Sequence, residues 1–150
     1  MAADAWVFYN KFHEYRGDGT IDLDDDTFKV ILVASGYTPS TSGHSTYADI
    51  TNELSTANGY TNGGQSLTSV TWTESGGTAT FDAANPSWTA SGGAITARYA
   101  VIYDDTPSSP ANPLVAYCLL DNSPADVTAN DGAAFTINLH ANGIFTSAAA

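Results

Sequence analysis

The chain has 150 residues, and its 16 acidic side chains outnumber its 4 basic ones, which gives a formal net charge of −12. Nucleic-acid binding depends on Lys and Arg contacts to phosphate, so this balance argues against a nucleic-acid partner. Apolar and aromatic residues make up 43% of the sequence. That content is enough for one hydrophobic core, so we expect a single globular molecule with a surface rich in Ser, Thr, Gly and Asn.

The first residues lack the basic and apolar regions of a secretory signal, and no stretch approaches the ~18–20 apolar residues of a membrane span. We therefore expect synthesis and folding in a cytoplasm and no membrane partner. Cys118 is the single cysteine and stands in an apolar run. The sequence predicts a buried thiol there and no intrachain disulfide.

The N-terminal segment is dense in aromatic side chains. Trp6, Tyr9 and Phe12 recur at helical spacing, and Phe8 joins them on a helical surface. This pattern predicts a short helix or arm over residues 1–16, which the glycines that follow should end. A β domain is then expected over residues 17–150.

Extended structure is expected after the arm. Ile21 and Leu23 alternate with aspartates, which favours a strand, and residues 28–33 form a continuous apolar run typical of a buried strand. Residues 35–64 are rich in Ser, Thr, Gly and Asn, with room for one turn of helix near Tyr47. Long loops of this kind often make functional contacts, so this excursion is a candidate binding surface.

A six-residue motif occurs in two nearly identical copies in the middle of the chain: WTESGG at 72–77 and WTASGG at 88–93. In each copy an alternating segment leads to a tryptophan, and a Ser-Gly-Gly triplet suits a tight turn. We therefore predict two related hairpins in a β-meander. The return strand of the second copy should run unbroken over residues 94–103.

The last third of the chain again predicts strands. Residues 114–120 form an apolar run expected of a core strand, residues 133–139 alternate, and residues 144–145 suit a short edge strand. Together these segments predict an all-β fold, an antiparallel β-sandwich of jelly-roll type with a short N-terminal helix or arm.

An aspartate cluster raises the question of a calcium site. Asp22, Asp24 and Asp26 occupy the first three odd positions of an EF-hand loop, but Thr27 stands where Gly is needed and Val33 where Glu is needed. We interpret the cluster as surface charge. Asp104, Asp105 and Asp121 offer carboxylates for another kind of ion site, which the sequence does not bring together.

No pattern in the sequence indicates a catalytic centre, a cofactor or a resident metal. The histidines His13, His44 and His140 lack the spacing of metal ligands, and no nucleophile motif occurs. We therefore expect a non-enzymatic protein that acts through its surfaces.

Four segments of the sequence carry a resemblance to a known group of proteins. They are FHEYRGDGTIDLDDDTFKVILVAS, YADITNELSTANGYTNGGQSL, VTWTESGGTATFDAANPSWTASGGAITARYAVIYDDT and PLVAYCLLDNSPADVTANDGAAFTINLHANGIF. In this order they resemble small structural proteins encoded in tailed-phage head gene clusters, over roughly residues 8–146. The resemblance implies a virion component, most closely a capsid decoration or cement protein on the outer capsid surface, with the major capsid protein and its own copies, as a dimer or trimer, for partners.

Exposed aromatic residues are the expected interface candidates, because Trp and Tyr dominate interaction hot spots. A tail or collar component of the same virion is an alternative function, and a carbohydrate-binding module that stacks aromatic rings on sugars is another. A hydrolase built on a carboxylate pair is a third possibility. The candidate interface residues are Trp6, Phe8, Tyr9, Phe12, Tyr37, Tyr47 and Tyr60.

Overall fold

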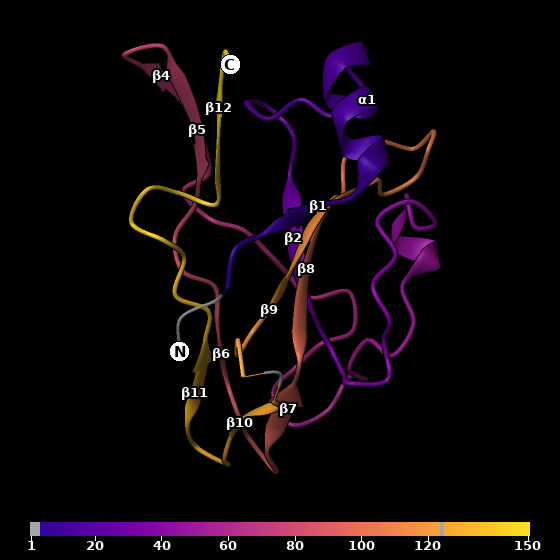
Figure 1. Ribbon diagram of the computed structural model, residues 1–150. Helices are drawn as coiled ribbons and strands as arrows, with labels where there is room; N and C mark the ends of the chain where they lie inside the picture. Colours follow the sequence, from indigo (N-terminus) through magenta and orange to yellow (C-terminus); the bar gives the residue numbers. More distant parts are fainter. Residues whose placement is uncertain (1–3, 124) are drawn as a thin grey trace.

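The computed structural model describes residues 4–123 and 125–150, which form antiparallel β-structure with one short α-helix (Figure 1). A five-stranded sheet makes one layer, and three shorter ladders face it across the main hydrophobic core. The predicted all-β, antiparallel class is therefore confirmed, and the layers are those of a sandwich. The jelly-roll strand order stays a prediction.

The large sheet has the strand order β1-β9-β8-β2-β3. Two of its three central strands, β9 and β2, are the apolar runs that the sequence marks as core strands, and the third, β8, is the second half of the strand expected over residues 94–103. The bounds are β1 Val7–Phe8, β9 Leu114–Leu119, β8 Tyr99–Asp104, β2 Phe28–Val33 and β3 Gln65–Ser66.

Both faces of this sheet are buried, which explains why its strands read as continuous apolar runs rather than as alternating ones. On β2, Val30 and Leu32 point into the main core, whereas Ile31 and Val33 belong to a second core on the opposite face. On β9 a bulge at Val115 shifts the register, because Ile102 pairs with Ala116 and Tyr103 with Leu114.

The first WTESGG copy forms the predicted hairpin. Strand β4, Thr71–Ser75, pairs with β5, Thr78–Asp82, across a two-residue turn of Gly76 and Gly77. Both glycines have positive φ, 63° and 87°, as a type I′ turn requires. The C-terminal strand β12, Phe145–Ala148, pairs with the other side of β5, as the predicted edge strand.

The second copy does not form a hairpin, so that prediction was wrong. Strand β6, Ser87–Thr89, pairs with β11, Ala134–Thr136, while β7, Ile95–Ala97, pairs with β10, Val127–Ala129. The segment between β6 and β7 is held by residues distant in the sequence: the Ser91 N–H donates to the Asn58 carbonyl, and the Gly92 N–H donates to the Asp131 carboxylate. These contacts replace the pairing that a local turn would need.

Two predicted strands are interrupted. The expected strand over 94–103 breaks at Arg98, where the chain passes from β7 to β8 and so changes sheets. The alternating segment that leads to the first tryptophan, residues 66–73, was expected as one strand and breaks before β4, where Ser69 adopts a positive φ of 53°. Local alternation continues through both breaks, so only the tertiary pairing reveals them.

The N-terminal arm is integrated into the fold. Its helix α1 spans Asn10–Asp18 and so starts later than the expected helix, because residues Val7–Phe8 pair with β9 instead. Gly19 ends the helix with a φ of 83°. No helix in the described ranges is long and apolar enough to cross a membrane.

The segment after α1 forms turns, not the extended strand expected from its alternation. The Asp22 carboxylate accepts the backbone N–H of Asp24 at 3.0 Å, which favours a turn. Ile21 and Leu23 are nevertheless buried in the main core. Alternation here reports burial of two side chains rather than strand pairing.

The excursion over residues 35–64 covers the second face of the large sheet. Its single helical turn is the 3₁₀ helix η1, Tyr47–Asp49. Tyr37 is buried in the second core, and Tyr47 and Ile50 pack against it. The Leu54 N–H donates to the Leu32 carbonyl at 3.0 Å, which ties the segment to β2.

Substitutions at two adjacent glycines, Gly63 and Gly64, would measure how closely the excursion packs on β2. Gly64 has a φ of 73°, and a Cβ there would lie 2.0 Å from the Val30 carbonyl oxygen, whereas Gly63 has a φ of 94° with open space around it. We expect Gly63→Ala to cost about 1–2 kcal/mol for its left-handed backbone. Gly64→Ala should cost about 1–3 kcal/mol more, because β2 must move. Urea denaturation measures both, and equal losses would contradict the close approach.

Candidate interaction surfaces

The structure does not gather the seven candidate aromatic residues into one surface. Tyr9, Phe12, Tyr37 and Tyr60 are each at most 2% exposed, so they have no area to offer a partner, and their assignment as interface residues is corrected. The physical reason is that the arm and the excursion fold back on the chain's own sheet. Trp6, Phe8 and Tyr47 are half-buried.

Tyr9 and Tyr37 form a buried hydrogen-bonded chain beneath the excursion. Their hydroxyl groups lie 2.8 Å apart, and the Tyr37 hydroxyl also lies 2.9 Å from Nδ1 of His44. The His44 ring stacks on Tyr37 with centroids 5.5 Å apart. Burial, with the Tyr37 contact, raises the pKa of Tyr9 far above its ordinary value. These phenols stay neutral and hold the second core together.

Tyr47 and Tyr60 converge on one carboxylate, that of Glu53. The Tyr60 hydroxyl donates to Glu53 Oε1 at 2.7 Å, the Gly63 N–H donates to the same oxygen at 2.6 Å, and the Tyr47 hydroxyl donates to Oε2. The Tyr60 hydroxyl in turn accepts the Leu32 N–H. Burial, followed by the bond to Glu53, raises the pKa of Tyr47. Sequence reasoning missed Glu53, because nothing in the sequence marks which hydroxyls meet it.

Phe8 and Phe12 belong to an aromatic cluster between α1 and the C-terminal strand. Their rings stack at 4.9 Å, and Phe145 meets the edge of Phe8 at 4.9 Å and that of Phe12 at 5.6 Å. Phe145 also contacts Trp72 on β4, with ring centroids 6.0 Å apart. The cluster therefore fixes the three-stranded sheet against the arm.

Strand β4 presents a free sheet edge. It is the last strand of the order β12-β5-β4, and in Figure 1 this sheet extends beyond the body at the upper left. Thr71, Thr73, Glu74 and Ser75 are exposed, and Trp72 is half-buried. Such an edge carries unpaired backbone groups that pair readily with another strand.

The turn type determines which backbone groups of β4 point outward. In a two-residue hairpin the closing pair, here Ser75 and Thr78, exchanges both backbone hydrogen bonds, and every second pair repeats the pattern. Thr73 is therefore bonded to Thr80 in the same way. The N–H and C=O groups of Trp72 and Glu74 point away from β5.

Trp6 lines a surface cavity of about 460 Å³. The His140 Nδ1 accepts the Asn142 N–H at 3.1 Å, so a neutral His140 carries its proton on Nε2. An aromatic face beside several polar groups suits a small polar ligand. The cavity is lined by Asp4, Ala5, Trp6, His140, Asn142, Gly143, Ile144 and Thr146.

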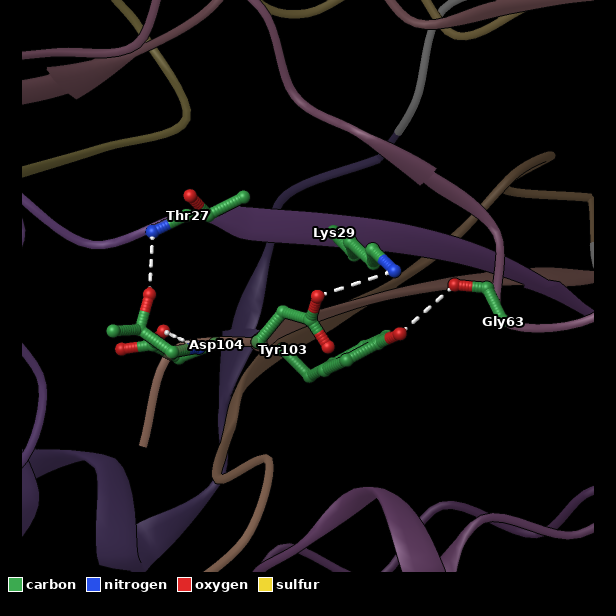
Figure 2. Close-up of polar contacts among 7 residues, drawn as sticks. Thr27, Lys29, Gly63, Tyr103 and Asp104 are labelled. Atoms are coloured by element: carbon green, nitrogen blue, oxygen red, sulfur yellow. Dashed lines mark hydrogen bonds and ion pairs between the residues drawn. The ribbon is translucent and has the colours of Figure 1, made fainter. Parts of the chain in front are cut away.

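The acidic residues serve several separate local contacts. Asp105 forms an ion pair with Lys29 at 3.1 Å (Figure 2), and the Asp121 carboxylate accepts the Ser123 N–H at 2.8 Å. Within residues 4–123 and 125–150, no three His, Cys, Asp or Glu side chains converge as metal ligands. Cys118 is buried as expected, and burial raises the pKa of its thiol.

No protein-family model matches the chain, and neither curated proteins nor solved structures gave a match.

The Glu53 cluster generates a stability prediction. We expect Glu53→Gln to lower the free energy of unfolding by about 1–3 kcal/mol, because a neutral amide accepts fewer of the three donors. Glu74→Gln is the matched control, since Glu74 is exposed and accepts one N–H, from Gly77. Urea denaturation measures both variants. A Glu53→Gln protein as stable as the control would show that the cluster does not hold the excursion.

Proposed function

We propose that this chain is a non-enzymatic structural subunit of a tailed-phage virion, of the capsid decoration class. It binds the outer capsid surface, where it bridges neighbouring major capsid proteins and contacts copies of itself. The resemblance over residues 8–146 supports this class, and the net charge of −12 disfavours nucleic acid as the partner. A decoration subunit works by contact area, so it needs a rigid body with a surface left to pair.

The free edge of β4 is the observation that carries the proposal. Edge strands are usually blocked by bulges, prolines or covering loops. The β4 edge has no proline, and Glu74 is its one charged residue. The backbone groups of Trp72 and Glu74 can therefore continue the sheet into a neighbouring strand.

A symmetric pairing of two β4 strands satisfies both geometry and charge. If two copies pair antiparallel about Thr73, Trp72 of each copy faces Glu74 of the other, and the outward groups of both residues find partners. The two glutamates then avoid direct opposition, which would destabilise the pair.

Net charge sets the conditions under which this edge works. Copies that each carry −12 repel one another in solution, and salt screens that repulsion. On a capsid, many identical contacts raise the effective concentration, so weak pairing becomes sufficient. Self-association is therefore expected to be weak in dilute buffer and stronger at high salt or on the shell.

Proline at position 74 tests the edge directly. Because the Glu74 N–H points away from β5, Glu74→Pro should remove an outward donor and leave the hairpin ladder intact. We expect Glu74→Pro to weaken the self-association constant at high salt by at least about tenfold, as measured by sedimentation velocity. The same variant should occupy fewer sites on capsids of the source phage. Glu74→Ala keeps the N–H and should associate at least as well as the unmodified protein. Equal association of the two variants would rule out the β4 edge as the contact.

A carbohydrate-binding role is a second candidate, favoured by the Trp6 cavity. Sugar rings stack on aromatic faces, and the carboxylate, imidazole and amide groups there suit hydroxyl groups. Binding to a glycan array that Trp6→Ala abolishes would favour this role over decoration.

A tail or collar position remains the nearest structural alternative. Electron cryomicroscopy of the virion distinguishes this location from one on the capsid. Density for this chain on the tail or collar and not on the capsid shell would contradict the proposal.

A further inference from the structure

Asp104 is a fully buried carboxylate at the end of β8. Its Oδ1 accepts the Thr106 N–H at 3.0 Å, but no N–H or hydroxyl group of the described residues donates to Oδ2, which is buried. In Figure 2 the side chain of the preceding residue, Tyr103, extends toward Gly63 and away from Asp104, and its hydroxyl donates to the Gly63 carbonyl at 2.9 Å. A buried carboxylate oxygen without a donor is rare and costly, so it requires a physical explanation.

The carboxylate that faces Asp104 is Asp26: the Asp105 N–H donates to the carbonyl of Thr27, the residue after Asp26, at 2.8 Å, and Asp26 contributes to the raised pKa of Asp104. Asp26 is already held in place, because its Oδ2 accepts the Asp22 N–H at 2.8 Å. The cation closest to Asp104 along β2 is Lys29, one residue after Phe28, which is the pairing partner of Asp104. Lys29 forms its ion pair with Asp105. The other charged groups of the surrounding turn, all exposed, are Asp22, Asp24 and Asp25.

Two ionised carboxylates cannot hydrogen-bond to each other, because both are acceptors only. A proton on one of them turns the contact into a strong O–H···O bond, as in other close carboxylate pairs. We propose that Asp26 and Asp104 share one proton, and that this bond locks the turn over residues 22–26 onto the end of β8. The lock is independent of the proposed function.

Neighbouring backbone contacts show what the lock holds together. The Asp105 N–H donates to the Thr27 carbonyl at 2.8 Å, and the Thr27 N–H donates to the Thr106 hydroxyl at 2.8 Å. The turn also carries Ile21 and Leu23 into the main core. Loss of the proton would place two negative charges in contact and loosen this junction, while the sheets beyond it stay paired.

The titration of the pair gives the direction of the effect. Burial, followed by the hydrogen bond with Asp26, raises the pKa of Asp104 to about 8. In the unfolded chain the same carboxyl ionises near pH 4. Between roughly pH 4 and pH 8 the folded state therefore holds a proton that the unfolded state has lost. The stabilisation is complete below pH 4, declines as pH rises, and is lost above about pH 8.

Replacing the shared proton by a permanent donor tests the proposal. The Asp104→Asn amide can donate to Asp26 at every pH. We expect the Tm of the unmodified protein to fall relative to that of Asp104→Asn between pH 5 and pH 9, with the variant more stable at pH 9. Asp26→Asn should behave in the same way. Asp25→Asn, which removes an exposed acid from the same turn, should follow the unmodified protein.

Parallel pH profiles for the unmodified protein and Asp104→Asn would overturn the proposal. So would a rise in Tm on adding CaCl₂ at pH 8 that Asp104→Asn abolishes, because the pair would then hold a cation. If the variant fails to fold, carboxyl ¹³C NMR of the unmodified protein decides. An Asp104 signal that titrates near pH 8 supports the shared proton, and one that titrates near pH 4 excludes it.

Discussion

Burial of the large sheet on both faces is the constraint on which the rest of the molecule depends. Strands β2, β8 and β9 have apolar side chains on each side, and two separate covers must exclude water from them. The shorter ladders provide one cover and the excursion over residues 35–64 provides the other. The aromatic side chains all belong to one of the two cores or pack against it. The surface that remains for partners is consequently polar and acidic, and it includes the exposed edge of β4.

Polar groups hold the second cover in place. A loop laid over a sheet must satisfy its own backbone and side-chain donors, and Glu53 and the Tyr9–Tyr37–His44 chain do so at two points. The Asp26–Asp104 contact has a comparable position on the main-core side, where the turn after α1 meets the end of β8. It differs in that two ionised carboxylates have no donor between them, so the proposed bond forms only while one of them is protonated and therefore depends on pH.

Much of this fold could be predicted from the sequence, because apolar runs and glycine turns are local signals. The strands at Phe28–Val33 and Leu114–Leu119, the Gly76-Gly77 hairpin and the buried Cys118 are of this kind. The partner of β6 was not predictable, since WTASGG carries the same turn signal as WTESGG and only distant contacts prevent the second hairpin. Four of the seven interface candidates are buried for a related reason: the sequence pattern of an aromatic residue is the same whether it packs on a partner or on the chain's own sheet.

Amide hydrogen exchange, residue by residue, tests the central claim most directly. If the doubly covered sheet is the rigid body and β4 its working edge, the amides of residues 30–33 and 101–102 should exchange most slowly in the dilute protein. Those of Trp72 and Glu74 should exchange fast in solution and become protected when the protein is bound to capsids. Protection of Trp72 and Glu74 in the dilute monomer, or no change on capsid binding, would contradict the account.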